Sequence, residues 1–238
     1  MKNIIFITII CLLNACSTKQ EKVCMQDLYI LADISDTLFA LDDLTEESIC
    51  KQLEVTKKTA LGANVHFIFI TNFRYTKDVT ISITDNASDR LNEVERKWEV
   101  DSFRKSISEQ CERIKESKKS IIGSAIFESL SRVLQVAKEK HSCTDIKVML
   151  LSDLRQFSSL CNTYDTLELN SFTRHFKDRI NWLDSTCNFP QSLKEFTIYF
   201  IHQSKTMKED IAFDIISTFM KKYLMQKGAT VFIRTSIQ

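Results

Sequence analysis

Three short stretches of hydroxyl and carboxylate side chains lie beside hydrophobic runs of the sequence. Asp33-Ile34-Ser35-Asp36-Thr37 follows one run, Ser152-Asp153 follows another, and the third stretch is Ser124-Ala125-Ile126. Hydrophobic runs of this length are typical of buried strands. Ligands of open α/β sheets bind beyond the carboxyl ends of the strands, and converging oxygen side chains suit a hard divalent cation. The spacing therefore predicts a cation site at one edge of a sheet.

The rest of the chain predicts strands and helices that alternate. Strands are expected at 27–32, 65–71, 79–84, 146–151, 196–201 and 230–234, and helices at 45–60, 88–118 (interrupted near 101–102), 124–140, 172–183 and through 211–223. Only residues 72–78 separate the second and third strands, which permits an antiparallel hairpin but no parallel crossover. We expect a three-layer α/β/α, Rossmann-like domain with a mostly parallel sheet and one antiparallel edge strand.

This order of elements and these motifs resemble the von Willebrand factor A (vWA) family. The first loop of that family reads Asp-x-Ser-x-Ser, and residues 33–37 read Asp-Ile-Ser-Asp-Thr. Its second loop enters a helix with Thr-x-Ile-x-x-Ala-Leu, and residues 124–130 read Ser-Ala-Ile-Phe-Glu-Ser-Leu. Its third loop carries an Asp after a strand, as Asp153 does here, although Leu154 replaces the usual Gly and Asp36 stands where the family has a small residue. The resemblance spans about residues 27–234.

The resemblance implies a metal site and a partner protein. Ser35, Thr37 and Ser124 would offer hydroxyl oxygens to Mg²⁺, or to Mn²⁺ or Ca²⁺, and Asp33 and Asp153 would hold the ion largely through water. Mg²⁺ prefers six oxygens in near-octahedral geometry and gives up its water reluctantly. Neutral hydroxyls leave residual positive charge on the ion, so an open coordination position could attract a carboxylate of a partner.

A second resemblance leads to an enzyme. Residues 33–38, Asp-Ile-Ser-Asp-Thr-Leu, are similar to the Asp-x-Asp-x-Thr-Leu motif of haloacid dehalogenase (HAD) phosphatases, and residues 70–72 to that family's second motif. The chemistry would be an aspartyl-phosphate formed on Asp33. Ser35, however, stands where that family has its acid/base Asp, and no convincing Lys and paired-Asp motif follows.

The first fifteen residues have the pattern of a signal peptide. One lysine precedes an apolar run from Ile4 to Leu13, about ten residues against the roughly 20 that span a bilayer. The run closes with Leu13-Asn14-Ala15-Cys16, which resembles the processing box of bacterial lipoproteins. The resemblance implies a signal peptide 1–15, a lipid-carrying Cys16, a tether 16–26 and a domain 27–238. It places the protein outside the cytoplasm, anchored to a membrane, with the outer membrane or its periplasmic face expected.

Six cysteines remain beyond Cys16, and an even number in an exported chain allows disulfides. Cys161 and Cys187 flank one irregular stretch, so we expect them to pair, although six cysteines allow 15 pairings. No Cys-x-x-Cys spacing indicates zinc, and the net charge of +1 gives no argument for nucleic acid. The chain contains three glycines and no P-loop, Gly-x-Ser-x-Gly elbow or His-Glu-x-x-His.

These observations together predict an exported, membrane-anchored vWA-like domain that binds a protein partner at the cell envelope, with Mg²⁺ assistance. The first alternative is a metal-free structural component of an envelope, secretion or conjugation assembly. The second is the HAD-like phosphatase with Asp33 as nucleophile. Residues 154–192 are expected to form the largest irregular insertion, and loops on a rigid scaffold often set specificity. We therefore expect this insertion to shape the partner site.

Overall fold

A computed structural model gives the structure of the chain, and it describes residues 25–35, 41–55, 61–71, 78–85, 91–117, 123–140, 146–203 and 206–237. Six strands form one sheet in the order β3-β2-β1-β4-β5-β6. The strands are β1 (Gln26–Asp33), β2 (Ala63–Ile70), β3 (Asp78–Ile83), β4 (Ile146–Leu151), β5 (Phe196–Ile201) and β6 (Thr230–Arg234). All neighbouring pairs are parallel except β2 and β3, so the expected antiparallel edge strand is confirmed.

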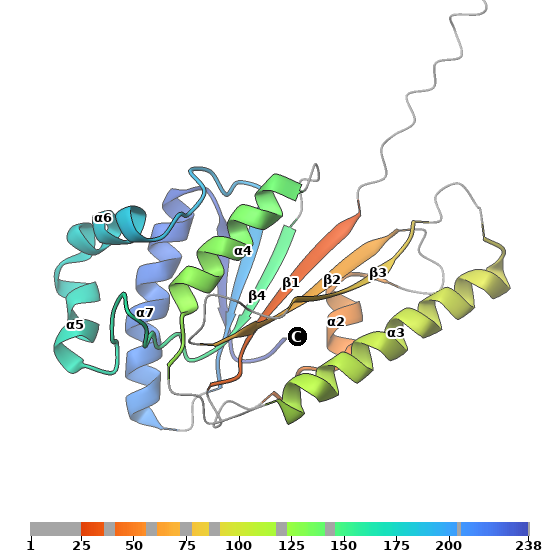
Figure 1. Cartoon of the computed structure of the whole chain (residues 1–238), viewed down its shortest axis with the longest axis horizontal. Coiled ribbons are helices and arrows are strands. Elements are labelled where there is room, and N and C mark those ends of the chain that lie inside the picture. The colour runs from red at the N-terminus through yellow and green to blue at the C-terminus, as the bar shows by residue number, and fades with distance from the viewer. Residues whose placement is uncertain are drawn as a thin grey trace, which may run out of the picture.

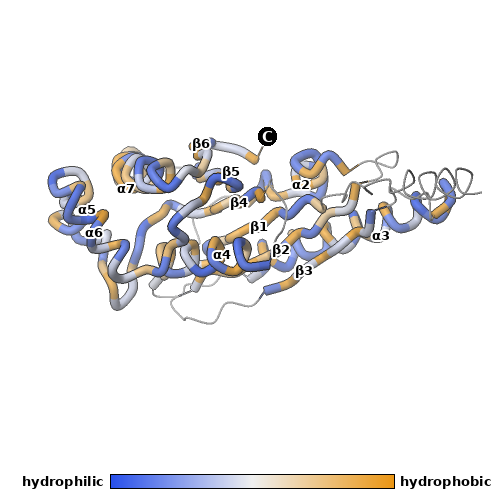
Figure 2. Tube along the Cα trace, turned by 90° about the horizontal axis from the view of Figure 1, so that it is seen from above, coloured by the Kyte–Doolittle hydropathy of each residue, from blue (hydrophilic) through white to orange (hydrophobic). Residues whose placement is uncertain are grey.

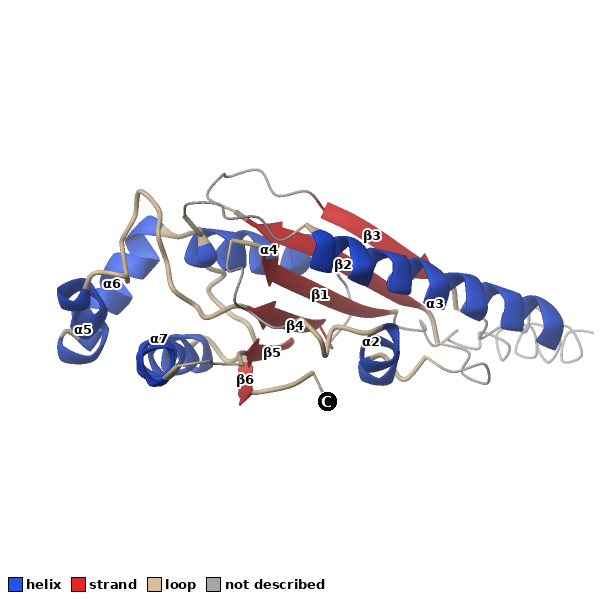
Figure 3. Cartoon of the chain, turned by 90° about the horizontal axis from the view of Figure 1, so that it is seen from below, coloured by secondary structure: helices blue, strands red, loops and turns tan. Residues whose placement is uncertain are grey.

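The described residues form six helices around this sheet (Figure 1). They are α2 (Glu46–Gln52), α3 (Glu93–Glu116), α4 (Ile126–Lys140), α5 (Thr166–Arg174), α6 (Phe176–Thr186) and α7 (Met207–Gln226). Helices α4 and α7 pack on one face and α2 and α3 on the other, while α5 lies against the outer side of α7 (Figure 3). The predicted α/β class with a Rossmann-like, three-layer arrangement is therefore correct.

The side chains of the central strand β1 alternate between the two faces of the sheet, and both faces are covered by helices. Leu28, Ile30 and Ala32 of β1 belong to the hydrophobic cluster under α2 and α3, and Tyr29 and Leu31 to the cluster under α4 and α7. Strand β1 is accordingly apolar through its middle, from Leu28 to Ala32, with polar residues at both ends (Figure 2). Successive side chains of a strand point to opposite faces, so a strand buried on both faces reads as a continuous apolar run. Because β1 is a central strand, its carboxyl end has a neighbouring strand, β2 or β4, on each side.

The structure corrects three sequence-based boundaries. The first helix ends at Gln52 because Glu54 adopts a left-handed conformation (φ 53°) and the N–H of Val55 donates back to the carbonyl of Cys50. Helix α3 is continuous through Asp101 and Ser102 because its buried stripe runs on without a break. Residues 154–192 contain two helices, α5 and α6, rather than one short helix in an irregular insertion.

Candidate functional site

The carboxyl ends of β1 and β4 bring Asp33 and Ser152 together. The two strands are parallel, with Ala32 opposite Leu151, so the next residue of each strand lies at the same level. The Ser152 hydroxyl donates to Asp33 Oδ2 at 3.1 Å. The sequence pattern gives Ser152 no role of its own, because its contact with Asp33 depends on the register of β1 against β4.

Four hydrogen bonds converge on the carboxylate of Asp33. Oδ1 accepts from the backbone N–H of Ser35 at 3.0 Å and from its hydroxyl at 2.7 Å. Oδ2 accepts from the hydroxyl of Ser124 at 2.8 Å and from that of Ser152. Asp33 is only 1 % exposed, so this carboxylate is buried among neutral donors. Three segments separated by up to 119 positions therefore meet at one side chain.

Burial raises the pKa of Asp33 above its ordinary value, and the hydrogen bonds from Ser35, Ser124 and Ser152 oppose that rise. Removal from water disfavours the charged form of a carboxyl group, whereas donors that point at it favour the charged form. Three hydroxyl groups and one backbone N–H still leave the negative charge without a full positive partner in this cluster. An added cation would remove that deficit.

Ser124 is positioned from both sides. Its backbone N–H donates to the carbonyl of Phe157 at 3.0 Å, and its carbonyl accepts from the N–H of Phe157 at 2.9 Å. The next residue, Ala125, donates its N–H to the carbonyl of Thr71 at the end of β2. Helix α4 begins two residues after Ser124, so the hydroxyl that reaches Asp33 is fixed at the entrance of this helix.

Asp153 faces its own loop. Its Oδ1 accepts from the backbone N–H of Arg155 at 2.8 Å, while the Ser152 hydroxyl accepts from the N–H of Leu154 at 2.9 Å. Asp153 is 7 % exposed and follows directly on a residue that touches Asp33. The Asp153 carboxylate therefore helps to fix the loop that follows β4.

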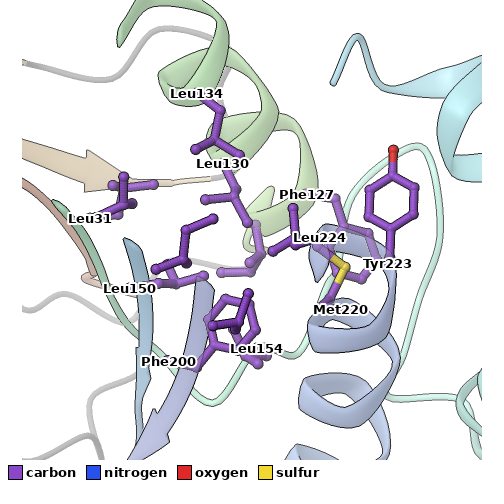
Figure 4. Packing of buried hydrophobic residues seen from close by; sticks show 14 of the residues in the cluster. Leu31, Phe127, Leu130, Leu134, Leu150, Leu154, Phe200, Met220, Tyr223 and Leu224 are labelled. Atoms are coloured by element: carbon purple, nitrogen blue, oxygen red, sulfur yellow. The ribbon is translucent and has the colours of Figure 1, made fainter. Parts of the chain in front are cut away.

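Leu154 stands where the vWA pattern has a glycine, and its backbone adopts a conformation that glycine favours. Its φ is 60°, in the left-handed region, which costs a residue with a Cβ about 1–2 kcal/mol. The side chain is fully buried and points into the cluster under α4 and α7, toward Phe200 (Figure 4). Removing a buried leucine costs about 2–5 kcal/mol, more than the strain, so the leucine is the more stable choice at this position.

Gln156 anchors the segment that follows Asp153, a role that sequence analysis missed. Its side chain is fully buried, and Oε1 accepts from the N–H of Phe127 in the first turn of α4 at 3.0 Å. Its Nε2 donates to Glu128 Oε2 at 2.5 Å and to the Ser158 hydroxyl at 2.6 Å. The beginning of the insertion is therefore tied to the same helix start that positions Ser124.

The predicted ligands fall into two groups. Asp33, Ser35 and Ser124 are in direct hydrogen-bond contact, and Asp153 follows Ser152 in the same loop. Thr37 and the predicted lipidation residue Cys16 lie outside the described residues. Across the parts of the chain that the structure describes, no three His, Cys, Asp or Glu side chains gather in a way that could hold a metal. An ion at Asp33 would therefore depend mainly on hydroxyl and water oxygens, a donor set that fits Mg²⁺.

The expected disulfide between Cys161 and Cys187 is not formed in the structure. Both residues carry free thiols and are buried in the hydrophobic cluster under α4 and α7. Burial raises the pKa of each thiol to about 12, and for Cys161 the nearby Glu168 and Glu128 add to the rise. As small apolar side chains, they pack in this cluster as thiols.

No protein-family model matches the chain, and no curated protein is significantly similar to it in sequence. None of the helices within the described ranges is both long enough and apolar enough to cross a membrane.

Proposed function

We propose that the chain is a vWA-like interaction domain, held at the cell envelope by a lipid on Cys16, that binds a divalent cation at Asp33 and a partner protein beside it. The observation that carries the proposal is the convergence of Ser35, Ser124 and Ser152 on the buried carboxylate of Asp33. These hydroxyls come from the three loops that the sequence resemblance singles out. Packing alone would not favour a carboxylate at this position, because a buried carboxylate costs free energy unless it is paired.

The arrangement of strands supports the same proposal. The family resemblance implies a mostly parallel sheet with an antiparallel strand after the first helix, and β3 is that strand. The left-handed backbone at Leu154, where the family has glycine, adds a local point of agreement.

The residues present fit a hard cation. Ser35 and Ser124 offer neutral hydroxyl oxygens beside the Asp33 carboxylate, and Asp153 adds a carboxylate to the loop that carries Ser152. A bound Mg²⁺ would supply a positive centre with an exchangeable coordination position. The protein's own part is to hold the hydroxyls in place, through Phe157 for Ser124 and through the β1–β4 register for Ser152.

A metal-free scaffold within a larger envelope assembly is the second candidate, and one observation favours it. Both oxygens of Asp33 already accept two hydrogen bonds each, so the cluster is satisfied without an ion. A bound ion would have to redirect the hydroxyl protons of Ser35 and Ser124. The two candidates therefore differ in a single measurable property, which is cation binding.

The contacts of Asp33 give little support to the phosphatase alternative. A nucleophilic carboxylate needs an oxygen that can reach a phosphoryl group, whereas Asp33 is almost completely buried and both of its oxygens are engaged. A generic phosphatase assay in Mg²⁺ tests this alternative, and activity that Asp33→Asn abolishes would favour it over the binding proposal.

Titration of the full chain with Mg²⁺ and Mn²⁺ tests the proposal. We expect saturable binding at millimolar metal or below, weakened about tenfold in Ser124→Ala, which corresponds to the loss of one oxygen ligand. Ser131→Ala is the matched control, because Ser131 is also buried on α4 but donates to the carbonyl of Glu128. Absence of binding at millimolar metal would leave the metal-free scaffold as the better proposal.

Membrane attachment and partner binding need separate tests. Cys16→Ser should move the protein from the membrane fraction to the soluble fraction if a lipid on Cys16 anchors it. A pull-down from host membranes with and without chelator should recover a partner only when metal is present. Deleting residues 160–186 should abolish that recovery if the insertion shapes the partner site.

A further inference from the structure

Helix α7 lies at the periphery of the molecule and carries a stripe of exposed side chains (Figure 3). Its members follow one another at intervals of three or four positions, namely Ile211, Asp214, Thr218, Lys222 and Met225. Residues with this spacing lie on one face of an α-helix. The opposite face of α7 is buried in the cluster under α4 and α7. Neither the vWA resemblance nor the proposed cation site uses the stripe.

The two charges of the stripe have no ion-pair partner within the residues that the structure describes. The carboxylate of Asp214 forms no salt bridge there. The ammonium group of Lys222 lies 5.7 Å from the centroid of the Phe176 ring, and this is a contact with an aromatic face rather than with an anion. Both charges are therefore available to a group that approaches α7 from outside.

The stripe is symmetric about Thr218. Asp214 precedes Thr218 by four positions, and Lys222 follows it by four. Ile211 precedes it by seven positions and Met225 follows it by seven, and each of these two apolar side chains is 52 % exposed. Opposite charges and matching apolar side chains thus stand at equal distances on either side of one small residue.

This symmetry makes the stripe complementary to itself. When two copies of a helix pack antiparallel about a two-fold axis, residues equally far before and after the axis lie at the same level. With the axis at Thr218, Asp214 of one copy meets Lys222 of the other, and Ile211 of one copy meets Met225 of the other. Two-fold interfaces bring the same patch of both subunits together, and opposite charges across an interface favour association.

A cavity of about 260 Å³ borders the stripe, between α7 and the helices α5 and α6. Its lining includes Asp214, Thr218 and Lys222 of the stripe, and Phe172 and Phe176 on the opposite side. A helix that lay on the stripe would cover the mouth of this cavity and remove the half-buried Phe176 from water. Burial of apolar surface would therefore add to the charge pairing.

We propose that α7 is a self-association surface, and that it pairs antiparallel with α7 of a second copy about a two-fold axis at Thr218. The 20 residues of α7 give a contact about 30 Å long. A single pair of helices is a small interface, so the dimer should be reversible. A lipid layer fits the stripe less well, because it would surround the carboxylate of Asp214 with hydrocarbon. The second copy instead supplies a cation at that level.

Sedimentation equilibrium of the full chain over a range of protein concentrations tests the proposal. We expect a monomer–dimer equilibrium with a Kd of about 100 µM or below. Asp214→Lys should weaken it at least about tenfold, because lysines would then face each other at two levels of the interface. Glu109→Lys is the matched control and should associate as the wild type does, since Glu109 is an exposed carboxylate on α3, on the other face of the sheet.

Exchange of the charges separates pairing across the interface from damage to the helix. Lys222→Asp should weaken association as much as Asp214→Lys does. The double variant Asp214→Lys/Lys222→Asp should recover the affinity of the wild type, and a mixture of the two single variants should form a heterodimer. Both combinations restore opposite charges at each level. Failure of both to associate would overturn the antiparallel pairing.

Oxidative cross-linking tests the position of the axis. Thr218→Cys would bring two thiols together at the axis, so copper phenanthroline should produce more disulfide-linked dimer than in the wild type or in Glu109→Cys. Equal cross-linking in all three would overturn the assigned axis.

A chain that sediments as a monomer at about ten times the expected Kd would overturn the proposal, and so would a dimer that Asp214→Lys leaves unchanged. A monomer that binds phosphatidylcholine vesicles or a foreign helix through Ile211 would assign the stripe to another occupant and would equally overturn it.

Discussion

The two ends of β1 each bury an aspartate that is 1 % exposed, on the same face of the sheet, yet the two carboxylates have different surroundings. Asp33, at the carboxyl end, is surrounded by the hydroxyls of Ser35, Ser124 and Ser152. Asp27, at the amino end, lies beside the ring of His66, which can carry a positive charge, and accepts from Asn64. A buried carboxylate can therefore be stabilised by many neutral donors or by a few partners that include an ionisable base.

The largest effect is expected from Asp33→Asn. The amide would turn donor N–H groups toward hydroxyls that now donate to a carboxylate, and several buried hydrogen bonds would be lost together. We expect a loss of about 3 kcal/mol in the free energy of unfolding, measured by urea denaturation. A loss below about 1 kcal/mol would show that the hydroxyl cluster contributes little to stability.

Leu154→Gly tests whether the loop beside Asp33 depends on burial or on backbone conformation. Glycine relieves the left-handed strain but removes a fully buried side chain, and the second effect is larger. We expect the free energy of unfolding to fall by about 2 kcal/mol in the same assay. An increase in stability would mean that strain, rather than packing, dominates at this residue.

Asp27→Asn is the matched substitution at the other end of β1. The new amide keeps one oxygen that can accept from Asn64, so fewer contacts are lost than at Asp33. We expect a loss of about 1 kcal/mol in the free energy of unfolding. A loss equal to that of Asp33→Asn would mean that the two surroundings are energetically equivalent.

The raised pKa of Asp33 should also make the stability of the protein depend on pH. Burial raises the pKa of Asp33 in the folded state above the ordinary value of 3.8, so the folded protein holds this proton more tightly than the unfolded chain does. The contribution of Asp33 to stability is therefore fully present below the unfolded pKa and is lost as the pH rises through the folded pKa. Urea denaturation at several pH values should show the stability of wild type relative to Asp33→Asn falling over this interval.

Millimolar Mg²⁺ provides the control for that pH dependence. A cation favours the ionised carboxylate, so metal binding should become tighter as the pH rises and should reduce the fall in stability. A fall that is identical with and without Mg²⁺ would argue against an ion at Asp33 and for the metal-free scaffold.

The sheet was predictable because its signals are local. Strands β4, β5 and β6 have the expected bounds, and the short link between β2 and β3 required an antiparallel pair. The helices of the insertion were only partly predicted, because residues 172–183 span the end of α5 and most of α6. The break between them lies at His175 (φ −122°, ψ 46°), where the sequence has neither a glycine nor a proline to signal it.

The sequence indicated four residues of the candidate site, Asp33, Ser35, Ser124 and Asp153. Each of them lies next to a strand or helix that the sequence also predicts. Ser152 and Gln156 were not assigned roles, since their contacts depend on the pairing of β1 with β4 and on the path of the loop over α4. The stack of Tyr29 on His66 has the same origin, because it requires the register between β1 and β2. Contacts between strands that are distant in sequence are thus the part that sequence patterns left undetermined.

The position of Asp27 and Asp33 on one strand has a consequence for engineering this protein. Asp27 and Asp33 are six positions apart on an extended strand, a distance of about 20 Å, and the five residues between them are buried and mostly apolar. Changes at such a distance normally add, so the double variant Asp27→Asn/Asp33→Asn should lose the sum of the two single losses to within about 0.5 kcal/mol. Each end of the strand can then be redesigned without recalibrating the other.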